Sequence, residues 1–147
     1  MKRLLTIFLL LGVVFFSEPS MAQDSKSITI IVNSKNPVAN MKRTKLSKIF
    51  LKKITKWEDG KEIIPIDLPA NSTIRKLFSK KVLKKNLSSV NNYWQQQLFS
   101  GRNIPPTIKE SENEILTFVK ANKNAIAYVS NPPDTKDVKV ITIEFDN

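Results

Sequence analysis

The 147-residue sequence contains no cysteine and no histidine. Without cysteine, the chain cannot form disulfide bonds or use a thiolate nucleophile. Without histidine as well, it lacks the residues that most zinc sites and catalytic triads require. The acids nearest the most basic part of the chain are Glu58, Asp59, Glu62 and Asp67, and their spacing shows no acid/base pair. We therefore expect no metal site, no cofactor and no enzymatic activity.

Glycine is also scarce, since only Gly60 and Gly101 follow residue 22. A loop that cradles nucleotide phosphates needs several closely spaced glycines, so nucleotide hydrolysis is excluded. An anion bound by this chain would have to be held by helix amides, hydroxyl groups and arginine.

The N-terminal segment has the layout of a secretory signal peptide. A basic start precedes an apolar run at residues 4–16, and Ser20-Met21-Ala22 then places small residues at the usual distances before a cleavage point. The apolar run is too short to span a bilayer comfortably, and no later cysteine offers a lipid anchor. We expect residues 1–22 to be removed and residues 23–147 to form one domain in the periplasm.

The chain carries a large positive charge. Its formal net charge of +11 becomes +10 after the expected cleavage, because Lys2, Arg3 and Glu18 are lost. Residues 42–85 hold fourteen Lys or Arg against four Asp or Glu. Such a balance is typical of proteins that meet nucleic acid, anionic membranes or anionic solutes, or simply of a solvated basic face. Export argues against nucleic acid as the usual partner, although charge alone leaves polyanion binding open.

Hydrophobic periodicity predicts four strands and four helices in one α/β domain. Strands are expected at residues 27–33, 62–67, 125–129 and 138–145, and helices from Thr44, from Ser72, over 88–101 and from Ser111. The alternation of strands and helices favours a mixed sheet flanked by helices, with right-handed crossovers and some parallel pairing.

Three local features sharpen this expectation. Pro65 within the second strand indicates a sheet edge or a bulge, because proline cannot donate to a strand ladder. Lys81 interrupts the apolar stripe of the second helix, so we expect this helix to loosen there. Tyr93 and Trp94 share the apolar face of the third helix and are expected to pack in the core.

Two strand-to-helix loops, residues 33–36 and 68–72, are rich in hydrogen-bonding side chains. In an open α/β sheet, ligands bind outside the carboxyl ends of the strands, where such loops meet. The candidate ligand-binding residues are Asn33, Ser34, Asn71, Ser72, Thr73 and Arg75.

The start of the second helix is the strongest of these candidates. Its free amides, the Ser72 and Thr73 hydroxyls and the Arg75 guanidinium can all donate to an oxyanion. Since no acid lies between Ile74 and Asn86, we expect a positive field that nearby carboxylates do not balance. The alternative is an ordinary helix cap, because Asn, Ser and Thr are favoured at this position for purely structural reasons.

Several spaced motifs resemble the phosphate-binding subunits of ABC transporters and their short relatives. They are "TKLSKIFLKKITKWEDGKEIIPIDLPANSTIRKLF", "YWQQQLFSGRNIPP" and "NAIAYVS", which occur in the same order over most of residues 28–130. The resemblance implies a single lobe of the type 2 periplasmic-binding-protein fold.

In this resemblance, Ser72 matches the serine of the family's Ser-Gly-Thr phosphate-binding turn, and Phe78 matches the aromatic residue that follows it. The chain departs from the pattern at Thr73 and Ile74, which replace the glycine and threonine. Leu68 and Ala70 stand where the family has arginine and aspartate, and Arg75 is expected to substitute for that missing arginine.

The resemblance implies a periplasmic solute-binding or accessory protein whose ligand is phosphate or a similar oxyanion. A single lobe leaves a ligand half exposed to water, so the second surface is expected from a homodimer or from a membrane or periplasmic protein partner. The alternative is a protein-interaction module that uses its basic surface and has no small-molecule ligand.

Overall fold

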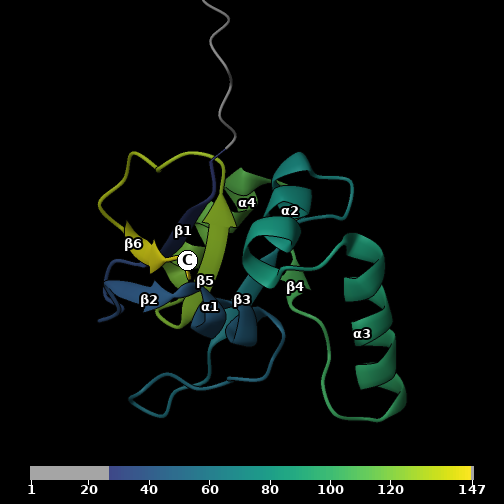
Figure 1. Ribbon diagram of the computed structural model, residues 1–147. Helices are drawn as coiled ribbons and strands as arrows, with labels where there is room; N and C mark the ends of the chain where they lie inside the picture. The colour runs from purple at the N-terminus through teal and green to yellow at the C-terminus, as the bar shows by residue number, and fades with distance from the viewer. Residues whose placement is uncertain (1–26, 147) are drawn as a thin grey trace, which may run out of the picture.

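The computed structural model describes residues 27–146, which form a mixed sheet with helices on both sides (Figure 1). The strands are β1 (Thr29–Asn33), β2 (Asn40–Lys42), β3 (Ile64–Asp67), β4 (Thr107–Ile108), β5 (Ala125–Val129) and β6 (Val138–Glu144). The helices are α1 (Arg43–Phe50), α2 (Thr73–Phe78), the π-helix η1 (Ser79–Leu83), α3 (Leu87–Phe99) and α4 (Glu112–Ala121).

The sheet has the strand order β2-β6-β1-β5-β3-β4. β3 runs parallel to both β5 and β4, and β2 runs parallel to β6. β1 is antiparallel to both of its neighbours, β5 and β6. The predicted mixed sheet is therefore confirmed. β1 and β3 lie on either side of β5 and run in opposite directions. The carboxyl ends of β1 and β3 therefore lie at opposite edges of the sheet.

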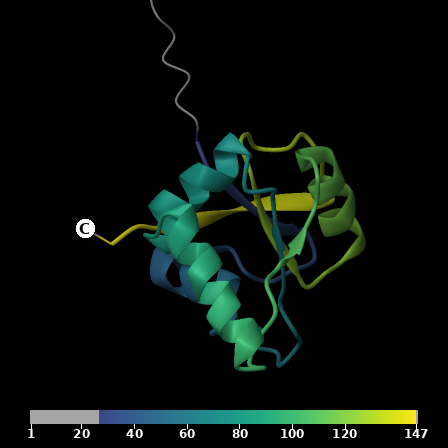
Figure 2. The ribbon, with the colours of Figure 1, turned by 90° about the vertical axis from the view of Figure 1, so that its right-hand side faces the viewer.

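Helices cover both faces of the central strands. α4 packs on one face, and α1, α2 and η1 pack on the other (Figure 2). All residues of β1 and β5 are buried, as expected for strands covered on both sides.

An aromatic cluster joins the sheet to the helices. The ring of Phe78 from α2 stacks on Tyr128 of β5, with centroids 4.0 Å apart and planes 7° apart. Phe50 of α1 packs at a tilt against both rings, at 4.7 Å from Phe78 and 5.8 Å from Tyr128. The cluster thereby fixes the position of α2 over the end of β5.

The sequence predicted the longer elements but missed β2 and β4. These strands have three and two residues and are mostly exposed, so they show no hydrophobic run. The edge prediction for Pro65 is consistent with the strand pairing. On one side, Pro65 lies opposite Ile126 of β5, but on the other side β4 pairs only with Ile66 and Asp67, so Pro65 has a strand neighbour on one side only. The predicted loosening near Lys81 is confirmed, because α2 changes into the π-helix η1 at Ser79.

α3 lies beside the body of the molecule (Figures 1 and 2). Val90 and Trp94 are buried, and the Tyr93 hydroxyl donates to the carbonyl of Leu51 at 2.7 Å, in agreement with the predicted core role. In the last turn of α3, by contrast, Leu98 is 52% exposed.

The predicted signal peptide lies outside the described residues. Within residues 27–146, no helix has both the length and the apolar character that a bilayer crossing requires.

The aromatic cluster leads to a stability prediction. Replacing Phe78 with Ala should lower the free energy of unfolding by about 3–5 kcal/mol, because the ring is fully buried and its loss leaves a cavity. The matched control is Phe99→Ala, because Phe99 is 93% exposed; its effect should stay within about 0.5 kcal/mol. Urea unfolding measures both values, and equal losses would contradict the packing described here.

Candidate functional site

The carboxyl ends of β3, β4 and β5 lie at one edge of the sheet, because these strands are parallel. The segments that follow them are joined by hydrogen bonds. The amide of Lys109, after β4, donates to the carbonyl of Asp67 at 3.0 Å. The amide and hydroxyl of Ser130, after β5, donate to the Glu112 carboxylate at 3.1 and 3.0 Å. Two strand-to-helix connections, from β3 to α2 and from β4 to α4, therefore converge at this edge with the loop from β5 to β6.

Ser72 is the N-cap of α2. Its backbone is extended, and its Oγ accepts a hydrogen bond from the amide of Arg75 at 3.4 Å. The ordinary capping role is therefore present, although the hydroxyl can still donate its own proton to a ligand. The neighbouring Asn71 and Thr73 are exposed.

Arg75 is buried in an ion pair with Asp67. The distance between Arg75 Nε and Asp67 Oδ1 is 2.9 Å, and the two side chains are only 8% and 10% exposed. The expected positive field without a balancing carboxylate is therefore wrong at this point. The reason is the path of residues 68–72, which returns the chain so that the first turn of α2 meets the end of β3.

The pairing through Nε leaves a buried nitrogen of the guanidinium unused. Arg75 Nη1 is buried and has no hydrogen-bond partner among the described residues. A buried charged donor without an acceptor is costly, and such groups in folded proteins commonly mark the place of a water molecule or a ligand.

Asp67 gathers three donors on one oxygen. The Tyr128 hydroxyl and the Leu68 amide, the latter at 2.9 Å, donate to Oδ1, and Arg75 Nε forms its ion pair with the same oxygen. Burial raises the pKa of Asp67 above its ordinary value, and the charge of Arg75 together with the other two donors opposes this rise. Burial and the adjacent Asp67 carboxylate also raise the pKa of Tyr128, which therefore remains a neutral donor.

Asn33 and Ser34 do not join this cluster. Asn33 Nδ2 donates to the carbonyls of Val119 and Lys120, both at 2.9 Å, and so caps the C-terminal end of α4. The Ser34 amide donates to the carbonyl of Asp137 at 2.9 Å. The expectation that both strand-to-helix loops form one site is wrong, because β1 runs antiparallel to β5 and ends at the opposite edge.

Sequence reasoning missed the roles of Asp67 and Tyr128. Both lie near the ends of predicted strands, at 62–67 and 125–129. Ligands of α/β sheets bind outside the carboxyl ends of strands, so a polar side chain at the end of an apolar run was the signal that could have identified them. The contact between Tyr128 and Asp67 depends on β5 lying beside β3, and a single sequence does not show which strands are neighbours.

The mixed sheet, with hydrogen-bonding loops at the carboxyl ends of its parallel strands, defines one lobe of a periplasmic-binding-protein fold. Residues 26–141 match the family described as the PBP superfamily domain, so the chain belongs to this family. A comparison with curated proteins finds no match.

Solved structures show the same fold. A protein from Clostridium perfringens, assigned as a phosphate ABC transporter substrate-binding protein and solved with bound phosphate, is 21% identical with a TM-score of 0.64. An ABC-type phosphate transport receptor from Vibrio cholerae is 23% identical with a TM-score of 0.62. Each match covers 79% of this chain but only 44% and 45% of the respective solved chains, so this chain spans less than half of their length.

The buried pair leads to a second stability prediction. Asp67→Asn should lower the free energy of unfolding by about 3–5 kcal/mol, because it leaves the Arg75 guanidinium buried without a counter-charge. The double variant Asp67→Asn/Arg75→Met should lose less than the sum of the two single variants, since the two residues interact directly.

Urea unfolding at pH 8 measures these losses, and Glu58→Gln is the matched control. Glu58 forms an exposed ion pair with Lys45 at 3.2 Å, so its replacement should cost less than about 1 kcal/mol. Additive losses at Asp67 and Arg75 would show that the pair is not coupled.

Proposed function

We propose that this chain is a non-enzymatic solute-binding or accessory protein that holds phosphate or a similar oxyanion beside Ser72 and Arg75. The observation that carries the proposal is the unpartnered Nη1 of the buried Arg75, at the sheet edge where the loops of this fold converge. Membership of the PBP superfamily supports it, as does the phosphate bound to the Clostridium perfringens protein.

In this proposal, each residue has a distinct task. Asp67 fixes the guanidinium of Arg75 through Nε, which leaves Nη1 for a ligand oxygen. Ser72 donates through its hydroxyl, and the exposed Asn71 and Thr73 supply further donors at the mouth of the site. Hydrogen bonds between an arginine and an oxyanion are charge-assisted and therefore stronger than neutral ones.

The length of the chain implies a second surface. A ligand at one sheet edge is half exposed, and competition from water weakens each contact there. The solved relatives are more than twice as long as the part that this chain matches. We therefore propose that tight capture requires another copy of the chain or a separate membrane or periplasmic protein, and that the protein acts in the periplasm after its signal peptide is removed.

A protein-interaction module without a small-molecule ligand is the second candidate function. The observation that favours it is the ion pair of Arg75, because Asp67 already neutralises the cation that would attract an oxyanion. In a pull-down with the immobilised chain, this candidate predicts that a periplasmic protein is retained and that the retained amount falls as the salt concentration rises. It also predicts that phosphate does not bind.

The oxyanion proposal predicts a specific pattern in calorimetric titration. Phosphate should bind the full-length chain, and Ser72→Ala should weaken binding by roughly three- to tenfold, the value of one hydrogen bond. Thr142→Ala, which removes an exposed hydroxyl on β6, should leave the affinity unchanged.

Sulfate and acetate serve as comparison ligands in the same titration. The site would be rejected if phosphate bound no more tightly than sulfate and acetate. It would also be rejected if the Ser72 and Thr142 variants lost the same phosphate affinity.

A further inference from the structure

A second basic feature lies on the outer side of α2 and η1, away from the buried Arg75. Four lysines line a surface cavity of about 640 Å³, together with Asn86 and Leu87. We call this cavity the lysine cradle, and its lysines are Lys76, Lys80, Lys84 and Lys85.

Among residues 27–146, no acidic side chain forms an ion pair with a lysine of the cradle. Residues 68–109 contain no Asp or Glu. The same segment contains Arg75, Lys76, Lys80, Lys81, Lys84, Lys85, Arg102 and Lys109. The ion pairs found within residues 27–146 are Arg43–Asp146, Lys45–Glu58, Lys61–Asp59 and Arg75–Asp67, so none of them uses a cradle lysine. Four ammonium groups around one cavity repel one another unless an anion is present.

The backbone holds these lysines on one side. Lys76 and Lys80 are four residues apart in continuous helix, so they lie on a common face. Lys84 and Lys85 directly follow η1, and the turn there brings both to the same cavity. Buried Ser79 fixes the end of η1: its hydroxyl donates to the Lys85 carbonyl at 2.7 Å, and its carbonyl accepts from the Lys85 amide at 3.1 Å.

Lys84 adopts a strained backbone conformation at this turn. Its φ of 55° lies in the left-handed region, which disfavours residues other than glycine. Such strain and π-helical turns both concentrate at functional sites. The cavity is the feature that distinguishes the cradle from a solvated basic face.

We propose that the lysine cradle binds a small polyanion that carries two or more phosphate groups, either free or on a lipid headgroup. Lysines act as point charges that tolerate varied geometry, and four of them match several phosphates better than one. The carbon stems of the lysines and the Leu87 side chain offer apolar contact for the rest of such a ligand. This site is separate from the buried Arg75 cluster and does not depend on the proposed function.

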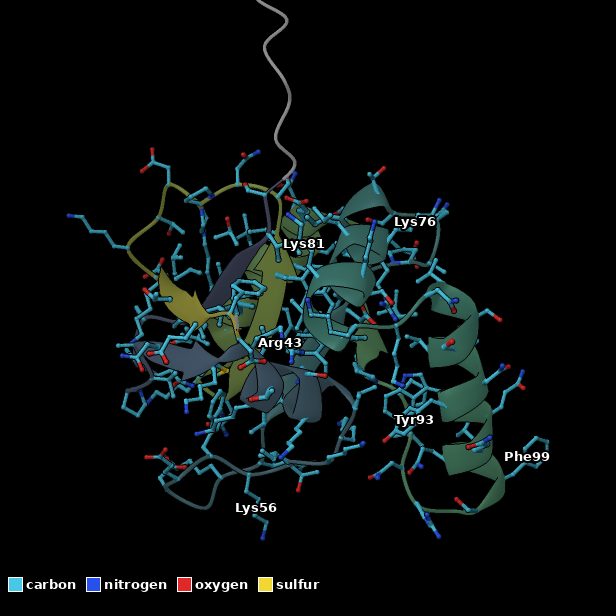
Figure 3. The ribbon with its side chains drawn as sticks, in the orientation of Figure 1. Arg43, Lys56, Lys76, Lys81, Tyr93 and Phe99 are labelled. Atoms are coloured by element: carbon cyan, nitrogen blue, oxygen red, sulfur yellow. The ribbon has the colours of Figure 1, made fainter. Side chains whose placement is uncertain are left out.

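The chain offers a closely matched control. Lys81 lies within the same π-helix and is exposed, but it is not part of the cavity lining. Figure 3 shows Lys76 on the side of α2 that faces α3, and Lys81 on the other side. Lys120, at the end of α4, is a second exposed lysine away from the cradle.

The test compares the full-length protein with two double variants of equal charge. Lys80→Gln/Lys84→Asn removes two cradle lysines, and asparagine is chosen at residue 84 because it tolerates positive φ. Lys81→Gln/Lys120→Gln removes two lysines elsewhere. Titration with inorganic tripolyphosphate tests a free ligand, and co-sedimentation with vesicles that contain cardiolipin, whose headgroup carries two phosphates, tests a lipid headgroup.

We expect binding in at least one of the two experiments, with a loss of about tenfold or more in the cradle variant and less than about threefold in the control. Binding in only one experiment identifies the source of the phosphate groups. No binding in either experiment, or equal losses in both variants, would overturn the proposal. Circular dichroism of both variants checks that the fold is retained.

Discussion

The buried ion pair between Asp67 and Arg75 is the interaction on which the candidate site depends. Taking two charges out of water is expensive, and the attraction between them compensates only where the geometry is good and further hydrogen bonds are present. Here the Tyr128 hydroxyl and the Leu68 amide supply those bonds to Asp67. The pair thereby joins the end of β3, the first turn of α2 and the end of β5. The pair also leaves Arg75 Nη1 without an acceptor among the described residues, and this is the observation on which the proposed oxyanion site rests.

The positive charge of the chain is divided between two environments. Arg75 is buried and locally neutralised, so an oxyanion there would be recognised by directed donors more than by a general field. The cradle lysines are unpaired within the described part of the chain and act through summed charge, which salt screens. The two proposals therefore differ in selectivity: the first assigns one small oxyanion to Arg75, and the second assigns ligands with several negative groups to the cradle.

The sequence predicted the elements well because long apolar runs and helix caps are local signals. The 125–129 strand, the Ser111 cap and the loosened helix near Lys81 all follow from residues close in the chain. Strand direction is not local: nothing within residues 27–36 shows that β1 lies antiparallel to β5, so Asn33 was placed at the wrong edge. The same limit applies to Arg75, whose partner lies eight residues earlier and is brought near by the loop between them.

The most direct test of the oxyanion site follows the Arg75 side chain itself. In ¹H–¹⁵N spectra, added phosphate should shift the guanidinium signals of Arg75 and the backbone amides of Thr73 and Ile74. Saturation of these shifts at a phosphate concentration where sulfate has no effect would support the site. If the Arg75 signals remain fixed while only exposed lysines respond, then the buried guanidinium has a purely structural role.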